Sequence, residues 1–401
     1  MEPKKYFIKT YGCQANIADS YKIEKTLINL GLEPLNIPRG YLKNEKEEFL
    51  YALRNCDLIV INTCSVRQKS EDKAYGLGLL ISNVKRNEKK NPLILFAGCI
   101  VGSTKGDRVM YPFEELRKKT EWADVYMTPG DIYKIPHILK NTGMITSYKQ
   151  KNNIKLITPL GLKDNHAFVN ISYGCDNFCT YCVVPYAREQ EVYRSKKDVL
   201  KEINILISQG IAEITLCGQN VNSWGLSRGE KAKVRLGKKK SLPFADLLRE
   251  VHKIREIKKI DFISSNPFDF TDDLVKAASL PKISNYIHIA AQSGNNDVLR
   301  RMNRKHTIEQ FYVLINKLKK AKPKIELGTD AIVGFPGETR EQFFDTVKLF
   351  EKVKFSAAFI SMYSPRKGTV AERFFKDNVS RKEKKWRHEY LTNIWLKSKE
   401  S

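Results

Sequence analysis

Short apolar runs alternate with longer stretches of mixed polar and apolar residues along almost the whole chain. In the first part, the runs expected to form strands lie at residues 6–10, 58–62, 93–97 and 124–127. Short continuous apolar runs are typical of buried strands, and the stretches between them are long enough for helices. The alternation therefore predicts an α/β domain with a doubly wound parallel sheet and helices on both of its faces.

The pattern breaks between about Met144 and Lys163, where the sequence becomes polar and aperiodic, and this break predicts a linker. Beyond it, six further candidate strands follow the same rhythm, at residues 167–173, 212–217, 259–264, 285–290, 325–332 and 355–362. Six βα units suit a partial, open (β/α)6 barrel better than a closed eight-fold one. In either architecture, ligands bind at the carboxyl ends of the strands.

The chain has 401 residues, of which 42% are hydrophobic and 29% are charged, so it is long enough to bury two cores. The sequence contains no run of eighteen apolar residues, and its N-terminus lacks the apolar core of a signal peptide. We therefore expect a cytoplasmic protein that is not bound to a membrane. The expected segments are a domain over 1–147, a linker over 148–163, a barrel over 164–378 and a basic helix over 379–401.

The net charge is +25, from 70 Lys and Arg against 45 Asp and Glu. Such an excess attracts polyanions, and nucleic acid is the natural partner; a lysine-rich composition with solvated faces is the alternative explanation of the total. Local clustering is more informative. Residues 228–240 contain seven cations and one acid without apolar periodicity, which predicts a mobile basic loop.

Cys175, Cys179 and Cys182 are spaced so that one short loop can place three thiolates at three corners of an iron–sulfur cube. No fourth protein ligand is offered, so one iron would stay open. A structural zinc site needs four ligands, and a redox pair would leave Cys175 unexplained. A helix carrying three small apolar residues on one face is the alternative. Gly174 and Pro185 bracket the run and favour a loop that leaves a strand.

Three more cysteines each follow a predicted strand of the first domain, namely Cys13, Cys64 and Cys99. The carboxyl ends of parallel strands meet at one edge of the sheet, so we expect these thiols to converge. This geometry is suited to a second cluster, again without a fourth ligand. Each cysteine by itself could be a small buried apolar residue. That simpler interpretation is kept for Cys56 and Cys217.

The run from Gly174 to Tyr186, with its three cysteines, resembles the cluster-binding signature of radical S-adenosylmethionine (SAM) methylthiotransferases. The resemblance extends from Tyr6 to about Arg373. It implies that Cys175, Cys179 and Cys182 hold a [4Fe-4S] cluster whose open iron binds SAM. It also implies that Cys13, Cys64 and Cys99 hold an auxiliary [4Fe-4S] cluster whose free iron carries the sulfur to be transferred.

The resemblance further implies that the strand ends of the barrel line a SAM pocket. The residues carried over for it are Tyr181, Gln219, Ser265, Gln292, Asp330 and Gly334. Simpler interpretations exist, because residues 216–222 could form an Asn-rich turn and the glycines after 328 could serve backbone turns. His288 is expected to be a packed core residue. The six histidines show no hydrolase-like spacing, and the sequence lacks a phosphate-binding loop with Lys-Ser or Lys-Thr.

Within the family, the segments around Cys13, Cys64 and Gly218 look most like the MiaB type. That type transfers a methylthio group to C2 of N6-isopentenyladenosine at position 37 of tRNA. Expected partners are tRNA and a flavodoxin-type or ferredoxin-type electron donor; the sulfur donor is not indicated, and we expect a monomer. Threonylcarbamoyladenosine of tRNA and an aspartate of a ribosomal protein are alternative acceptors. A metal-stabilised nucleic-acid-binding protein without catalysis is the alternative from another class.

Several positions depart from the family pattern. Ala15 stands where Met is usual, Asn266 where His is usual, and residues 187–189 read Ala-Arg-Glu in place of Thr-Arg-Gly. Residues 288–291 also lack the usual Leu-Pro. We expect altered contacts near the reacting base. The sequence given ends at Ser401, where relatives continue into a small β-barrel that grips tRNA (the TRAM domain), so that domain is expected to be missing.

Overall fold

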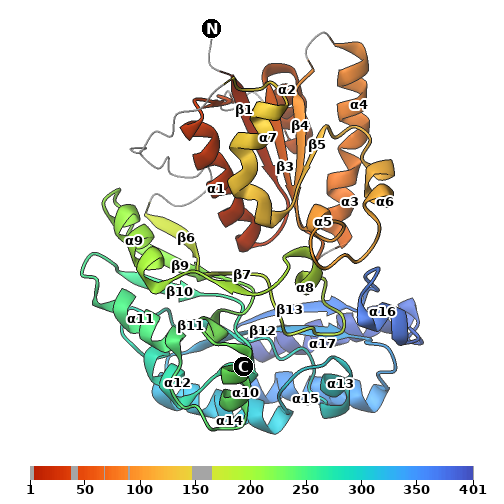
Figure 1. Ribbon diagram of the computed structural model, residues 1–401. Coiled ribbons are helices and arrows are strands. Elements are labelled where there is room, and N and C mark those ends of the chain that lie inside the picture. Colours follow the sequence, from red (N-terminus) through yellow and green to blue (C-terminus); the bar gives the residue numbers. More distant parts are fainter. Residues whose placement is uncertain (1–3, 38–43, 67, 89–90, 147–164, 401) are drawn as a thin grey trace. The chain divides into compact units, whose positions relative to one another are not determined.

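The computed structural model describes residues 4–37, 44–66, 68–88, 91–146 and 165–400 (Figure 1). The chain divides into two compact units. Unit 1 comprises Met1–Gly161 together with Val183–Gln190, and unit 2 comprises Leu162–Cys182 together with Glu191–Ser401. The predicted linker, 148–163, lies outside the described residues. None of the described helices is both long enough and apolar enough to span a membrane.

Unit 1 is built on a five-stranded parallel sheet in the order β2-β1-β3-β4-β5. Its strands are β1 (Lys5–Thr10), β2 (Glu33–Pro34), β3 (Leu58–Thr63), β4 (Leu93–Gly98) and β5 (Val125–Met127). Its helices are α1 (Gln14–Asn29), α2 (Glu45–Asn55), α3 (Gln68–Gly76), α4 (Gly78–Asn87), α5 (Cys99–Gly102), α6 (Phe113–Lys119), η1 (Pro129–Lys134), α7 (Ile135–Asn141) and α8 (Val184–Ala187). All four predicted strands of this part are confirmed.

Both faces of this sheet are buried, because side chains along a strand alternate between its two sides. Leu58 and Val60 of β3 pack in one apolar cluster with Leu27 of α1. Ile59 and Ile61, on the opposite face, pack in a second cluster with residues of α2, α3, α4 and α6. Figure 1 shows α1 and α7 on one side of the sheet. The predicted doubly wound fold is therefore confirmed, and its strand order reverses between β1 and β3.

Unit 2 contains six main parallel strands. They are β6 (His166–Asn170), β9 (Glu213–Cys217), β10 (Lys259–Phe262), β11 (Tyr286–His288), β12 (Glu326–Val333) and β13 (Ala357–Met362). The first three pair in the order β10-β9-β6 and the last three in the order β11-β12-β13. Isolated bridges, Ile260 to Ile283 and Ser265 to Ile289, connect the two sets. Six parallel strands in chain order confirm the predicted partial barrel.

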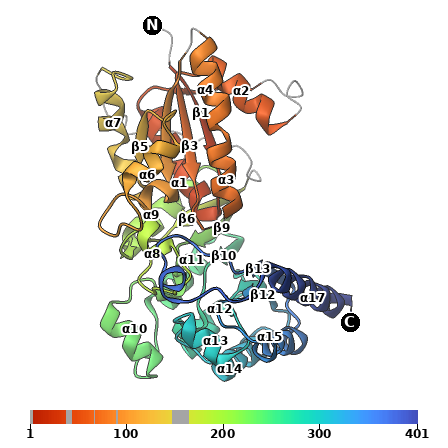
Figure 2. The ribbon, with the colours of Figure 1, turned by 90° about the vertical axis from the view of Figure 1, so that its right-hand side faces the viewer.

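The helices of unit 2, several of which are labelled in Figure 2, and a small antiparallel pair complete it. The pair consists of β7 (Ser172–Tyr173) and β8 (Val192–Tyr193). The helices are α9 (Lys196–Ile207), η2 (Val221–Ser223), α10 (Arg228–Arg235), α11 (Pro243–Lys253), η3 (Pro267–Asp269), α12 (Asp272–Ala278), α13 (Asn296–Arg301), α14 (Ile308–Ala321), α15 (Arg340–Val353), α16 (Val370–Phe374) and α17 (Arg381–Glu400). Apolar side chains of α11, α12, α14 and α15 pack with those of the strands in one large core.

The predicted basic loop at 228–240 is wrong for its first eight residues, which form α10. Ser227 caps this helix and makes a reciprocal capping box with Glu230, and this cap favours a helical start. Lys231 contacts Glu191, and Arg235 forms an ion pair of 2.9 Å with Asp269. Part of the positive charge of this segment is therefore already neutralised within unit 2.

The basic C-terminal segment does form a helix, α17, which packs against α15 and β13. Two of its cations are buried there. Arg387 forms a 2.8 Å ion pair with Glu338, and the two side chains are only 4% and 1% exposed. Lys384 pairs with Asp377 at 2.6 Å. These two cations stabilise the packing of the helix and do not lie on an open basic surface.

Candidate metal centres

The three cysteines of unit 1 lie at the carboxyl ends of three neighbouring strands. Cys13 follows β1 and is the N-cap of α1, Cys64 follows β3, and Cys99 follows β4 as the first residue of α5. Gly98 has φ of 98°, and a Cβ built on it would lie 2.4 Å from the Thr63 carbonyl oxygen. A glycine is required here because the backbones of β3 and β4 approach closely where they deliver their cysteines.

Burial and polar contacts distinguish these thiols from ordinary core cysteines. Cys64 and Cys99 are 3% and 2% exposed, whereas Cys13 is exposed. A hydrogen bond from Cys64, together with the nearby Arg188 guanidinium, lowers the pKa of Cys99 to about 6 although burial opposes this. The same shared hydrogen bond, followed by burial, raises the pKa of Cys64. The two thiols therefore share one hydrogen bond, as closely placed cysteines do.

Nitrogen donors surround the sulfur atoms of this site. The Val66 amide lies 3.4 Å from Cys64 Sγ, and the side-chain amide nitrogen of Asn16 lies 3.9 Å from Cys99 Sγ. Asn16 is held in place because its side-chain nitrogen also donates to the Thr63 carbonyl oxygen at 2.9 Å. Hydrogen bonds to sulfur are a general feature of protein-bound iron–sulfur clusters.

Sequence reasoning missed a buried ion pair beside this trio. Arg188 donates to Asp19 Oδ2 at 2.7 Å, and their side chains are 3% and 2% exposed. Burial disfavours the guanidinium charge, but Asp19, Cys99 and Cys13 outweigh it and raise the pKa of Arg188. Arg188 is the unchanged middle residue of the Ala187-Arg-Glu189 segment, so the departures at 187 and 189 gave no signal for it. Glu189 has φ of 62°, a left-handed backbone angle that glycine adopts without strain.

In unit 2, Cys175, Cys179 and Cys182 lie in a loop between β7 and α8. The helical alternative is wrong, because Gly174 and Phe178 have left-handed backbone angles, with φ of 68° and 48°. The end of α13 holds the loop through hydrogen bonds. Thr180 Oγ1 donates to the Arg301 carbonyl oxygen at 2.8 Å, and the Thr180 amide donates to that of Met302 at 3.1 Å.

The charges around this loop differ from those in unit 1. Burial, then Glu191 and the two other cysteines, raises the pKa of Cys175. Arg304, which sequence reasoning also missed, lies beside Cys179, with Nη1 at 3.6 Å from Sγ. The same nitrogen donates to Asn266 Oδ1 at 2.8 Å, and Nη2 donates to the Ala290 carbonyl oxygen at 2.7 Å. No sequence signal identified Arg304.

The predicted pocket residues occupy the strand ends of unit 2, and contact with a cofactor stays a prediction for all of them. Tyr181 is partly buried within the cysteine loop, and burial followed by the nearby Cys179 raises its pKa. Gln219 follows β9, and Ser265 follows β10. Gln292 is 8% exposed, has φ of 72°, and its amide donates to the Asp330 carbonyl oxygen at 2.8 Å.

Two of these residues already have protein contacts. Asp330 accepts a 2.7 Å hydrogen bond from His288 Nε2, whose Nδ1 lies 3.0 Å from the Tyr286 hydroxyl. The His288 side chain is only 13% exposed and its ring packs against those of Tyr286 and Phe359, which agrees with the interpretation of a packed residue. Gly334 has φ of 71°, and an added Cβ would lie 2.4 Å from Lys384 Cγ. Packing against α17 is enough to explain that glycine.

Several buried polar atoms of unit 2 have no hydrogen-bond partner among the described residues. They include Ser265 Oγ, Ser172 Oγ, Arg304 Nε and both ring nitrogens of His306. Unpaired buried polar groups are rare in native proteins, so a bound polar ligand is expected to satisfy some of them. The donor set therefore fits a group with several polar atoms, such as SAM.

Within the described ranges, no three His, Cys, Asp or Glu side chains are grouped to hold a single metal ion. Three thiolates without a fourth ligand suit a multi-iron cluster, whose corners lie further apart than the ligands of one ion.

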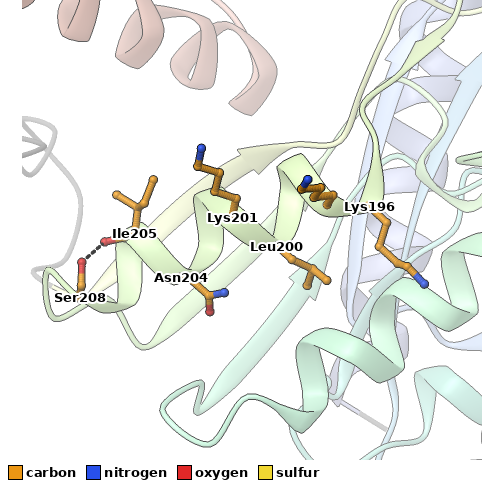
Figure 3. Close-up of a pocket in the computed structure, with 7 residues that line it drawn as sticks. Lys196, Leu200, Lys201, Asn204, Ile205 and Ser208 are labelled. Atoms are coloured by element: carbon orange, nitrogen blue, oxygen red, sulfur yellow. Dashed lines mark hydrogen bonds between the residues drawn. The ribbon is translucent and has the colours of Figure 1, made fainter. Parts of the chain in front are cut away.

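A surface groove along α9 is distinct from both cysteine sites (Figure 3). It is lined by Lys196, Lys197, Leu200, Lys201, Asn204, Ile205 and Ser208. Ser208 Oγ donates to the Ile205 carbonyl oxygen at 2.7 Å. The groove contains none of the predicted site residues, but it contributes exposed lysines to the surface of unit 2.

The sequence matches the Radical SAM superfamily over residues 169–350 and the uncharacterized protein family UPF0004 over residues 5–127. A Clostridium botulinum protein named tRNA-2-methylthio-N(6)-dimethylallyladenosine synthase is 37% identical over 97% of this chain and 81% of its own length. A Shouchella clausii protein of the same name is 37% identical over 96% of this chain and 69% of its own length.

Similar solved structures support the fold alone. The radical S-adenosylmethionine methyltransferase TsrM from Kitasatospora setae aligns with a TM-score of 0.60 and 14% identity. The alignment covers 89% of this chain and 73% of that one.

Proposed function

Because the chain belongs to the family of tRNA-2-methylthio-N(6)-dimethylallyladenosine synthases, we propose that it is a radical SAM tRNA methylthiotransferase. It transfers a methylthio group to C2 of N6-isopentenyladenosine at position 37 of tRNA. The observation that carries this proposal is the pair of cysteine trios at strand ends, each with three thiols and no fourth ligand among the described residues.

The reaction uses two [4Fe-4S] clusters and SAM. Cys175, Cys179 and Cys182 hold the cluster that cleaves SAM. When bound, SAM would supply both the methyl group and the radical that removes hydrogen from the adenine carbon. Arg304, Ser265 and the carboxyl-end residues of the strands would bind and orient SAM. Arg304 lies beside Cys179, and Arg304 Nε and Ser265 Oγ are buried without a hydrogen-bond partner among the described residues.

Cys13, Cys64 and Cys99 hold the auxiliary cluster, at which sulfur is bound before transfer. We assign this role to a domain over 1–147, joined by a linker over 148–163 to a barrel over 164–378, with 379–401 as a basic helix. The pocket assignment includes Tyr181, Gln219, Gln292, Asp330 and Gly334. A flavodoxin-type or ferredoxin-type protein supplies electrons to the monomer in the cytoplasm.

Anaerobic reconstitution tests the class of protein. The enzyme is expected to bind about eight irons per chain and, once reduced, to cleave SAM. Zinc in place of iron, or SAM that stays intact, would favour the metal-stabilised nucleic-acid-binding protein.

Mass spectrometry of tRNA nucleosides tests the acceptor. A host that lacks its own enzyme is expected to gain 2-methylthio-N6-isopentenyladenosine when it expresses this chain. Methylthiolated threonylcarbamoyladenosine, or a modified ribosomal protein, would instead identify one of the sister reactions.

A further inference from the structure

The buried pair of Arg188 and Asp19 links the end of α8 to α1 within unit 1. Two charges removed from water cost free energy that their attraction only partly recovers, and apolar residues of the same volume are often at least as stable. The pair is almost fully buried, at 3% and 2% exposure. Its position beside Cys99 and Cys13 therefore calls for a chemical explanation.

The backbone around Arg188 is fixed on two sides. Its amide donates to the Val184 carbonyl oxygen at 2.9 Å, which ends α8. A Cβ built on Gly102 of α5 would lie 2.0 Å from the Ala187 carbonyl oxygen. The chain before Arg188 thus lies directly on the short helix that begins with Cys99. Asp19 lies on α1, the helix that Cys13 caps.

The guanidinium can do more than pair with Asp19. It carries five N–H donors in a rigid planar fork. One donor is used at 2.7 Å by Asp19, which fixes the plane of the group. The guanidinium also lies within hydrogen-bonding reach of the Cys99 side chain. Arg188 therefore presents oriented donors at the place where the three cysteines converge.

We propose that Arg188 binds the sulfur anion that the unit 1 site holds, a sulfide or methylthiolate, with Asp19 fixing its orientation. This inference rests on the proposed function, because it takes a cluster at Cys13, Cys64 and Cys99. Charge-assisted hydrogen bonds to sulfur stabilise the anion against its protonated, dissociating form. They also raise the reduction potential of a cluster by stabilising its more negative state.

The test uses the full chain with Cys175, Cys179 and Cys182 all changed to Ala, so that only the unit 1 cluster forms. Methanethiolate is titrated into the reconstituted protein, and its affinity and the cluster's reduction potential are measured by electron paramagnetic resonance. Arg188→Gln is expected to weaken methanethiolate binding roughly 10- to 100-fold, the range seen when a group behind a metal ligand is removed. The reduction potential is expected to fall while about four irons are retained.

Asp19→Asn and Arg188→Lys supply the second measurement, since either keeps a hydrogen-bonding group at its position. Both are expected to bind methanethiolate with intermediate affinity. Asp19→Asn removes the carboxylate that orients the guanidinium, and Arg188→Lys replaces the planar fork by a single ammonium group. The matched control is Arg54→Gln, which removes an exposed Arg54–Glu88 pair of 2.8 Å from the same unit and should change neither quantity.

Unchanged affinity and potential in Arg188→Gln at full iron content would overturn the proposal. If that variant fails to take up iron, unchanged values in both Asp19→Asn and Arg188→Lys would overturn it equally. Failure of the parent protein, with Arg188 intact, to bind iron at all would instead overturn the proposed function on which the inference rests.

Discussion

The two cysteine sites reach similar chemistry by opposite structural routes. In unit 2, one loop of eight residues carries Cys175, Cys179 and Cys182, so the site is local in the sequence. In unit 1, Cys13, Cys64 and Cys99 come from three strands and meet only after the sheet has formed. The unit 2 site can be identified from the spacing of its cysteines in the sequence. The unit 1 site depends on the order and register of the strands that bring its cysteines together.

The buried arginines of the two sites differ in their partners. Arg188 of unit 1 is paired with the carboxylate of Asp19. Arg304 of unit 2 is bound by neutral oxygens, Asn266 Oδ1 and the Ala290 carbonyl, and lies 5.1 Å from the Phe268 ring centroid. Among the described residues, Arg304 therefore has neutral hydrogen-bond acceptors where Arg188 has a carboxylate that orients it. The comparison predicts that charge changes act differently at the two sites.

Removal of one cysteine from each site should have the largest effect. Cys99→Ala is expected to abolish methylthio transfer but keep SAM cleavage, because the unit 2 loop is intact. Cys179→Ala is expected to abolish both. Iron should fall from about eight to about four per chain in each variant. Iron analysis and assay of 5′-deoxyadenosine provide the measurement.

Cys56→Ala is the matched control for this comparison. Cys56 is fully buried at the end of α2, outside both trios. Iron content and both activities should be unchanged in it. Loss of SAM cleavage in Cys99→Ala would contradict the separation of the two roles.

The two sites also differ in how much of each could be predicted from the sequence alone. The strand pattern predicted the parallel sheet and the six-stranded barrel, because buried parallel strands have a strong local signature. The cysteines of unit 1 were singled out because each follows a predicted strand. Those of unit 2 were singled out because the three share one loop. Arg188 and Arg304 were not assigned roles, because a buried arginine is recognised only by its partners, and Asp19 lies 169 residues from Arg188. Residues 228–235 were misassigned because the capping box at Ser227 was overlooked.

Asn266→Asp tests the difference in partners directly, since it gives Arg304 the carboxylate partner that Arg188 already has. The new charge cancels that of Arg304, so we expect SAM to bind about tenfold more weakly, a loss of about 1.4 kcal/mol. Equilibrium dialysis of the reconstituted protein measures this. Asn266→His, which restores the residue usual in relatives, is the comparison variant.

The Asn266 side-chain nitrogen also donates to Asn220 Oδ1 at 2.7 Å, and Asn266→Asp loses this hydrogen bond. The unfolding midpoint of the variant is therefore measured as the control for a loss of stability. A SAM affinity equal to that of the unchanged protein would show that Arg304 does not act through its charge.

A third buried arginine provides a purely structural reference. Arg387 of α17 pairs with the Glu338 carboxylate at 2.8 Å and also donates to the Glu338 carbonyl oxygen at 2.9 Å. Arg387→Met leaves the Glu338 carboxylate buried and unpaired, so we expect a loss of roughly 3–5 kcal/mol in the free energy of unfolding. Urea denaturation of the apoprotein measures it.

The double variant Arg387→Met, Glu338→Leu should recover most of that stability, because no charge of the pair is left buried. If the double variant is as unstable as the single one, the pair has a role beyond charge compensation. The exposed Arg54–Glu88 pair is the control, and its removal should cost about 0–1 kcal/mol.

The smallest expected effect concerns the basic surface of unit 2. Lys238 and Lys240 are exposed, whereas Lys239 lies 3.2 Å from Glu230. Lys238 and Lys240 are therefore more available to phosphate than Lys239. Changing both to Gln should weaken tRNA binding and reduce the slope of log affinity against log salt by about 0.7–0.9 for each phosphate that is no longer neutralised. The groove lysines Lys196 and Lys201, changed to Gln, form the matched pair on α9. If the slope falls in the Lys196/Lys201 variant but not in the Lys238/Lys240 variant, the tRNA binds along the groove. Unchanged slopes in both variants would exclude both surfaces. The reason is that every phosphate neutralised by a lysine must release counterions.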